Sequence, residues 1–135
     1  MSERTLVLVK PDAVSRGLVG EVLGRYERKG LRIVAMDQRT VDGETADRHY
    51  AEHLERDFYP PLRAFVTSGP LVALEHHGDQ AIAVVRAING ATDGRAAAAG
   101  TIRGDLSLSN RENIVHASDS AESAAREIAI FFPAL

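Results

Sequence analysis

The sequence predicts an α+β fold, and two observations carry this prediction. Apolar residues at helical spacing alternate with short runs of aliphatic and β-branched residues, which is typical of helices alternating with strands. The expected order is strand, helix, strand, two helices, strand, helix, loop, strand and helix. Without the helical pair in the middle, this order is βαββαβ followed by one more helix. We therefore expect a ferredoxin-like, four-stranded antiparallel sheet with helices covering it and an added helical hairpin.

The expected strands are short and rich in aliphatic and β-branched residues. Pro11 ends the first strand because it lacks the backbone donor of a sheet ladder. After the third strand we expect a solvated turn that contains His76 and His77, and the fourth strand ends at His116. In chain order the strands are residues 5–9, 31–41, 71–75 and 113–116.

Helices are expected where apolar residues share one helical face. Gly30 stops the first of them, as a glycine commonly does after a helix. Asp119 and Glu122 have the spacing of a capping box that opens the last helix. Residues 91–109 show little periodicity and are expected to form a long loop, which favours a functional role. The helices are residues 18–29, 44–53, 59–68, 79–90 and the stretch from 119 onward.

Composition sets limits on the class of protein. With 135 residues, 44% of them hydrophobic, residues 1–135 suit a single domain. The absence of cysteine excludes disulfides, a thiol nucleophile and thiolate metal ligands. The first apolar run is too short for a signal peptide or a membrane span, so we expect a cytoplasmic protein with no membrane partner. A net charge of −3 argues against nucleic acid as a partner, and any bound anion must be held by a local cluster.

The usual nucleotide-binding glycine motifs are absent, and the segment HYAEH offers a different kind of site. Its residues His49 and His53 are four positions apart, a spacing that helical metal sites use. A zinc site would need a third ligand. The alternative is that one histidine packs against the core and the other is solvated. A small metal-binding module is therefore one hypothesis, which metal analysis of the purified protein would test.

His116 has more informative neighbours. It stands at a strand end, just before the polar residues 118–120 at a helix N-terminus, where backbone donors favour anions. Glu127 follows on the helix and can accept a hydrogen bond from one ring nitrogen, which leaves the other nitrogen as a nucleophile. Taken alone, a purely structural histidine explains this position equally well.

Cationic residues at the ends of elements favour the functional interpretation. Lys10 follows the first strand, Arg86 lies beside a buried helical stripe, and Arg103 lies in the segment GTIRGD. Arginine binds phosphate through a planar fork and lysine acts as a point charge. Each also has an ordinary alternative: Arg86 can extend along the surface, and Arg103 can pair with Asp105.

The segments TLVLVKPDAVSRGLVGEVLGRYERKG, HYAEH, FVTSGP, GTIRGD and NIVHASDSAESAAREIAIFF together resemble nucleoside diphosphate kinase in its short bacterial form. This resemblance implies transfer of the γ-phosphate of a nucleoside triphosphate, mainly ATP, to a nucleoside diphosphate. It implies a ping-pong mechanism through a phosphohistidine on His116, with broad base specificity. The alternative is a non-catalytic nucleotide-binding paralogue with the same fold.

The resemblance implies roles for individual residues. Glu127 and Ser118 match the positions that orient the ring of His116, and Tyr50 and Lys10 match those near the transferred phosphoryl group. The nucleotide-binding positions are matched by Lys10, Phe58, Leu62, Arg86, Thr92, Arg103 and Asn113. Among these, Phe58 stacks on the base with Leu62 across from it. Asn113 contacts the sugar, and the others hold phosphates.

The resemblance also implies a cofactor and an assembly. The cofactor is Mg²⁺, held by the nucleotide phosphates without a direct protein ligand, and Asp119 lies where it would reach the ion through water. The assembly is a homo-oligomer, with a hexamer as the expected form. A tetramer or a dimer stays open because Gly94 and Ala99 stand where relatives often have loop prolines.

Overall fold

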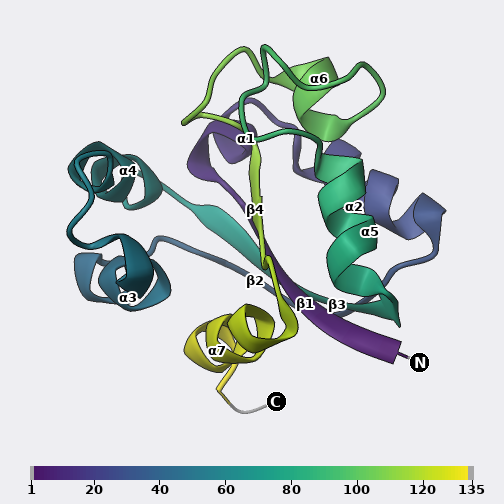
Figure 1. Ribbon diagram of the computed structural model, residues 1–135, viewed down its shortest axis with the longest axis horizontal. Coiled ribbons are helices and arrows are strands. Elements are labelled where there is room, and N and C mark those ends of the chain that lie inside the picture. The colour runs from purple at the N-terminus through teal and green to yellow at the C-terminus, as the bar shows by residue number, and fades with distance from the viewer. Residues whose placement is uncertain (1, 134–135) are drawn as a thin grey trace.

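The computed structural model describes residues 2–133, whose centre is an antiparallel sheet with the strand order β2-β3-β1-β4 (Figure 1). This order and the antiparallel pairing of all neighbouring strands confirm the expected ferredoxin-like plan. The strands are β1 Ser2–Val9, β2 Arg32–Arg39, β3 Leu71–Asp79 and β4 Val115–Ala117.

The expected helices are confirmed, and two short helices join them. Both additions span five residues, which is too short for apolar periodicity to reveal them. The additions are α1 Pro11–Ser15 and α6 Ile102–Leu106. The others are α2 Val19–Lys29, α3 Gly43–His49, α4 Tyr59–Val66, α5 Ala81–Asn89 and α7 Ala121–Phe131, with a 3₁₀ turn at Ala51–His53. None of the helices within residues 2–133 is long and apolar enough to cross a membrane.

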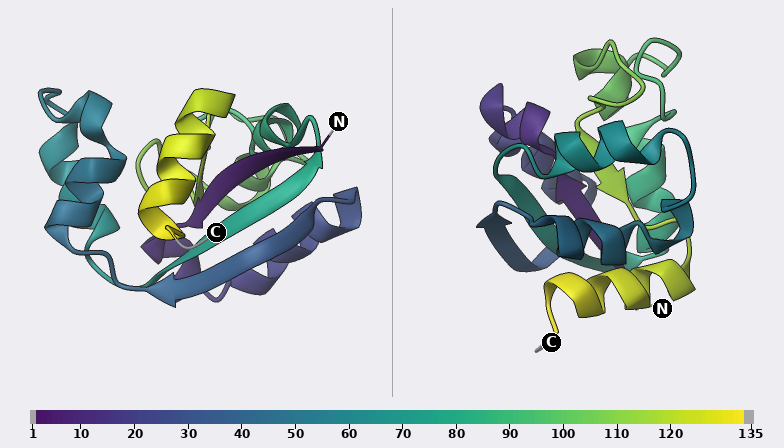
Figure 2. Two further views of the ribbon diagram at one scale, coloured as in Figure 1. Left: turned by 90° about the horizontal axis from the view of Figure 1, so that it is seen from below. Right: turned by 90° about the vertical axis from the view of Figure 1, so that its left-hand side faces the viewer.

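Helices cover both faces of the sheet because the strands are apolar on both sides. In β1, Val7 and Val9 contact the core under α2 and α5, whereas Leu6 and Leu8 contact the core under α3, α4 and α7. We call these the α2 face and the α7 face; Figure 2 shows α2 and α7 on opposite sides of the strands. Burying each such side chain contributes about 1.5–3 kcal/mol. The core that holds the sheet rigid therefore extends on both sides of β1.

The carboxyl-terminal half of β3 corrects the expected solvated turn. The strand continues to Asp79, and His76 is fully buried on the α2 face with its ring edge-on to Tyr26. Glu75, on the α7 face, is 2% exposed and accepts from Nε2 of His77 over 2.6 Å. The polar sequence suggested a turn, but β3 is a central strand. Pairing with β1 and β2 on either side keeps it extended.

The start of α7 corrects a second expectation. Its N-cap is Ser120, whose side chain accepts from the backbone N–H of Ser123, and not Asp119. Ser120 is the extended residue immediately before the first helical residue, so its hydroxyl is the group placed to accept that bond. Asp119 lies one position too early and is exposed.

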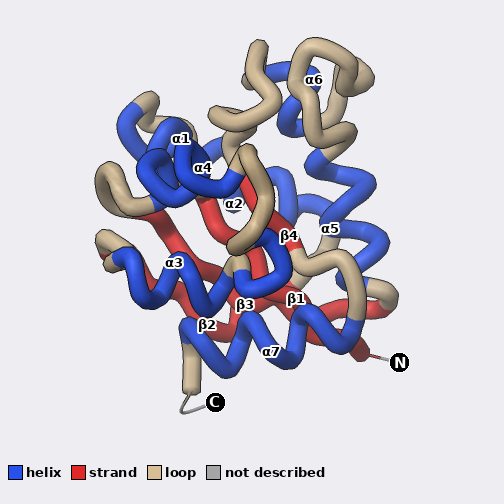
Figure 3. Tube along the Cα trace, turned by 60° about the vertical axis from the view of Figure 1, so that its left-hand side comes forward, coloured by secondary structure: helices blue, strands red, loops and turns tan. Residues whose placement is uncertain are grey.

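The helical hairpin of α3 and α4 lies beside α7 at one end of the sheet (Figure 3). Asp42 caps α3 by accepting from the backbone N–H of Thr45, and Asp47 accepts from the Tyr59 hydroxyl and the Arg63 guanidinium, which ties α3 to α4. Because α3 ends at His49, the two histidines of HYAEH are not on one continuous helix. The hairpin instead forms one wall of a cavity.

Candidate active site

A cavity of about 760 Å³ opens between the α3–α4 hairpin, the end of α5, the loop before β4 and the start of α7. Its wall holds eleven of the residues to which the family resemblance assigns a role, although they come from distant segments of the chain. They are Lys10, Tyr50, Phe58, Leu62, Arg86, Thr92, Arg103, Asn113, His116, Asp119 and Glu127. Ser118 is fully buried behind this wall.

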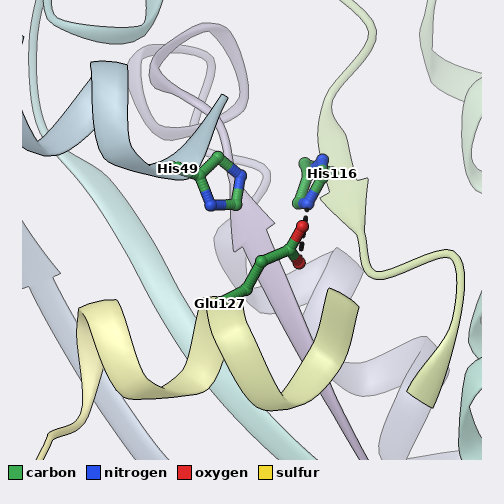
Figure 4. Close-up of side chains that lie close together, drawn as sticks. All are labelled: His49, His116 and Glu127. Atoms are coloured by element: carbon green, nitrogen blue, oxygen red, sulfur yellow. Dashed lines mark hydrogen bonds and ion pairs between the residues drawn. The ribbon is translucent and has the colours of Figure 1, made fainter. Parts of the chain in front are cut away.

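His116 and Glu127 form a pair at the base of the cavity (Figure 4). Nε2 of His116 lies 3.2 Å from Oε1 of Glu127, and the Ser118 hydroxyl donates to the same oxygen over 2.7 Å. A carboxylate only accepts hydrogen bonds, so Nε2 carries the hydrogen and Nδ1 of the neutral ring keeps its lone pair. Ser118 also accepts from the backbone N–H of Leu6, which anchors the carboxylate to β1. The pair therefore fixes both the orientation and the tautomer of the imidazole.

The segment before His116 has a strained backbone. Ile114 has φ +75°, in the left-handed region that β-branched residues avoid. Its carbonyl accepts from the backbone N–H of Lys10, and its own N–H donates to Oδ2 of Asp12. Such a conformation costs about 1–3 kcal/mol and persists only where the surroundings impose it. The start of α1 therefore helps set where β4 begins and where the His116 ring lies.

Lys10 is a buried cation at the cavity wall. It is 6% exposed, and its Nζ donates to Oδ1 of Asn113 over 2.8 Å. Burial, reinforced by the nearby charge of Arg103 and opposed by that of Asp12, lowers the pKa of Lys10 to about 8. The side chain is mostly charged at neutral pH and lacks bulk water around it, which strengthens its attraction for an anion.

Arg103 and Arg86 differ in how they are held. Arg103 donates to the carbonyls of Gly90, Asn113 and Val115, and burial lowers its pKa. The alternative pairing of Arg103 with Asp105 is wrong, because Asp105 pairs with Arg25 instead. Arg86 is exposed at the cavity, with one long contact of 3.5 Å to a carbonyl. Its guanidinium is thus available to a ligand.

Asn113 is held by the protein itself. Its amide nitrogen donates to the carbonyls of Thr92 and Asn110, and its oxygen accepts from Lys10. Both amide hydrogens are used, so this side chain connects the loop to Lys10 and has no hydrogen left to donate to a sugar. The backbone of Thr92 is thereby fixed beside the cavity.

The outer end of the cavity is apolar and open. Phe58 is 48% exposed at the N-terminus of α4, with Leu62 one turn further along the helix. Leu108 is 87% exposed and also lines the cavity, although no motif or periodicity singled it out. An exposed aromatic ring beside a cationic interior suits a ligand with a flat end and an anionic end.

His49 also lies at this site. The spacing in HYAEH paired it with His53, but its neighbour in the structure is His116. His49 is 3% exposed, and its ring lies edge-on to the rings of His116 and Tyr50, each with centroids 4.5 Å away. Burial, helped by the nearby His116 ring, lowers the pKa of His49 well below its usual range, and burial raises that of Tyr50. His53 is half-buried beside Phe58. The contact between His49 and His116 joins residues too distant in sequence for any spacing rule.

A cavity that is cationic within and aromatic at its mouth suits a ligand with phosphates and a flat base, so the site is that of a nucleotide-binding protein. Comparison with known sequences gives the family. The sequence profile of the family "Nucleoside diphosphate kinase" matches residues 3–135, and the chain belongs to that family. Its members transfer phosphoryl groups between nucleotides and use a divalent cation, so this chain is an enzyme that binds nucleotides.

Relatives and solved structures agree with this assignment. A nucleoside diphosphate kinase of Nocardioides sp. is 70% identical over 135 residues, the whole of both chains. One of Mycobacteroides abscessus is 60% identical over 136 residues, again with both chains covered completely. The structure of a nucleoside diphosphate kinase from Halobacterium salinarum in complex with CDP superposes with a TM-score of 0.95 and 46% identity, over 98% of this chain and 88% of that one. The structure of the Aquifex aeolicus nucleoside diphosphate kinase superposes with a TM-score of 0.94 and 41% identity, over 98% of this chain and 96% of that one.

Proposed function

We propose that the enzyme works by a ping-pong mechanism through a phosphohistidine on His116, with ATP as the main donor and any common nucleoside diphosphate as acceptor. The observation that carries the proposal is the bond between Nε2 of His116 and Glu127. It leaves Nδ1 with its lone pair at the wall of a cavity of about 760 Å³, a volume in the range of small-molecule sites.

The chemistry has two mirrored halves. In the first, Nδ1 of His116 attacks the γ-phosphorus, the bond to the bridging oxygen breaks, and the diphosphate leaves with the electron pair of that bond. The ring gains positive charge as the N–P bond forms, and Glu127 stabilises it through the Nε2 hydrogen. In the second half, a terminal oxygen of the acceptor diphosphate attacks the phosphorus and the N–P bond breaks.

Cations around the cavity neutralise the phosphates during both halves. Lys10 and Arg86 supply charge directly, and Arg103 supplies it while bracing the carbonyls around β4. The Tyr50 hydroxyl is protonated at neutral pH, as tyrosines ordinarily are, and burial raises its pKa further, so it is able to donate to a phosphoryl oxygen. Thr92 lies with them on the cavity wall and completes the phosphate-binding set.

Base recognition rests on stacking at Phe58, with Leu62 beside it. Stacking on an aromatic side chain contributes about 1–3 kcal/mol per base and tolerates every base. The half-exposed ring of Phe58 supports this role, and a related enzyme has been crystallised with CDP. Broad base specificity follows, because the interaction does not depend on the pattern of base-edge hydrogen bonds.

The residues present fit Mg²⁺ as the divalent ion. Mg²⁺ prefers oxygen ligands and keeps several waters when phosphates hold it. The exposed carboxylate of Asp119 at the cavity wall suits contact through such a water, and a hydrogen bond from Ser123 lowers its pKa and keeps it ionised. When bound, the ion offsets negative charge on the phosphates.

We further infer that residues 1–135 act as a single domain. We expect the protein in the cytoplasm, where nucleoside triphosphates are made and used. We also expect it to assemble into a homo-oligomer, with a hexamer as the expected form. The edge strand β2 supports assembly, since Val34 and Met36 are 37% and 59% exposed on it. Light scattering distinguishes the hexamer from a tetramer or a dimer.

Labelling with γ-³²P ATP tests the mechanism. We expect label to stay on the denatured wild-type protein, to be lost in acid, and to be absent from His116→Ala. The matched control is His77→Ala, which removes the histidine of the other glutamate–histidine pair and should label normally. Persistent label on His116→Ala, or none on folded wild-type protein, would contradict the mechanism. Nucleotide binding without exchange would favour the non-catalytic paralogue.

A further inference from the structure

His49 is a buried imidazole whose polar atoms are unused. It is 3% exposed, and neither ring nitrogen has a hydrogen-bond partner within residues 2–133. Buried polar atoms of this kind are uncommon because leaving them without a partner costs free energy. The ring faces His116 and Glu127, which lie across a small gap from it (Figure 4). This arrangement suggests that a ligand can satisfy the ring nitrogens.

The three side chains offer a set of metal ligands. One donor atom from each of His49, His116 and Glu127 lies within 4.8 Å of the other two. Ligands at about 2.0–2.1 Å from a tetrahedral zinc ion are themselves roughly 3.3 Å apart. The 3.2 Å between Nε2 of His116 and Oε1 of Glu127 already matches that separation. Two imidazoles and one carboxylate, with the fourth position open to the cavity, form a ligand set that zinc enzymes use.

We propose that His49, His116 and Glu127 bind a divalent transition-metal ion such as Zn²⁺, and that the bound ion inhibits the enzyme. A neutral imidazole has one N–H and one lone pair. If the metal takes the lone pair of His116 at Nε2, the ring hydrogen moves to Nδ1, and Nδ1 can no longer attack phosphorus. If the metal binds Nδ1 instead, it occupies the nucleophile itself. Either geometry blocks phosphoryl transfer. The inhibition rests on the proposed role of His116 as nucleophile, whereas the binding of the metal does not.

The ligand chemistry separates this site from the one for Mg²⁺. Mg²⁺ favours oxygen ligands, whereas zinc and copper bind imidazole well, so excess Mg²⁺ does not compete for His49. The lowered pKa of His49 supports the site, since a neutral ring has a free lone pair at neutral pH. The charges of Lys10 and Arg126, which face His49, oppose a cation. We therefore expect weaker binding than in a closed structural zinc site.

Titration of the nucleotide-free wild-type enzyme with ZnCl₂ in a calorimeter tests the site. We expect one ion per chain and about 10- to 100-fold weaker binding in His49→Asn. His53→Asn is the matched control, because it removes the other histidine of HYAEH, and it should keep wild-type affinity. X-ray absorption of the zinc-loaded wild type, which needs no variant, should show two imidazole ligands. Equal affinity in His49→Asn and wild type, or a spectrum without imidazole ligands, would overturn the site.

Labelling of His116 in the presence of zinc tests the inhibition. Wild-type enzyme loaded with zinc should lose most of its label from Mg·ATP and regain it with EDTA, whereas His49→Asn should keep its own zinc-free level. Sequestration of ATP by zinc would affect both proteins equally and would overturn the inhibition, as would unchanged labelling of zinc-loaded wild type. The two proposals can also fail separately. If zinc binding depends on His49 but the protein takes no label even without zinc, the metal site is supported and the phosphohistidine mechanism is contradicted.

Discussion

Two glutamate–histidine pairs lie on the α7 face of the sheet, and their surroundings differ more than their geometry does. His116 stands opposite Leu8 of β1 and bonds to Glu127 at 3.2 Å, whereas His77 stands opposite Arg4 and bonds to Glu75 at 2.6 Å. Judged by distance alone, the second pair is the stronger one.

Their environments distinguish the pairs. The pair at His116 borders the cavity, whose wall also holds Lys10, Arg86 and Arg103. The pair of Glu75 and His77 lies outside that cavity, with Arg4 at 3.6 Å as a further partner. A carboxylate can orient an imidazole anywhere, but chemistry requires a free nitrogen that faces a space where an anion is stabilised. The first pair should therefore control rate, and the region around the second should control stability.

Matched substitutions of the two carboxylates should have the largest contrast. Glu127→Gln keeps the shape near His116 but removes the charge that stabilises the ring during transfer, so we expect kcat to fall about 100-fold. Glu75→Gln should leave kcat close to that of the wild type. Steady-state kinetics with ATP and a nucleoside diphosphate measure both. Similar losses in the two variants would mean that the pairs are not separated in function.

The loss of folding stability in acid should depend on the buried His76, which lies between Glu75 and His77 of the second pair. Burial lowers its pKa from 6.5 to about 4, so the unfolded state binds a proton at a pH where the folded state does not. Stability therefore falls as pH drops through this window. Between pH 7 and pH 5 the loss from His76 is about 2 kcal/mol.

His76→Val removes this titration. Urea unfolding at the two pH values should show that the variant loses about 2 kcal/mol less than the wild type on acidification. The measurement at pH 7 serves as the control, because a change in packing alters the unfolding free energy of the variant equally at pH 7 and pH 5. An equal loss in both proteins would show that His76 does not account for the acid sensitivity.

A smaller effect should appear at alkaline pH in the cavity. Lys10, with its pKa lowered to about 8, loses its charge above that pH in the free enzyme. We expect kcat/KM for the nucleotide to fall about fivefold between pH 8 and pH 9, while kcat, which reports the nucleotide complex, changes less. Lys10→Gln should have a lower kcat/KM at pH 7 and no such alkaline decline. An alkaline decline that persists in Lys10→Gln would assign it to another group.

The sequence predicted the sheet and the long helices because apolar periodicity and helix-stopping glycines are local signals. Family resemblance, which carries positions over without needing contacts, predicted eleven residues of the cavity wall. The local pattern was wrong about His76, where pairing in a central strand and the ring of Tyr26 outweigh local polarity. It placed His49 with His53, because spacing alone could not show that α3 ends at His49 or that the ring faces His116.

The unfavourable backbone of Ile114 has a consequence for how the enzyme comes into being. A chain segment with this residue does not adopt φ +75° by itself; Lys10 and Asp12, about a hundred positions earlier, hold it there. The proposed nucleophile, His116, is therefore positioned only after the two ends of the chain have met. A nascent or partly folded chain has His116 but not its geometry, so completing the fold is also what switches on its reactivity.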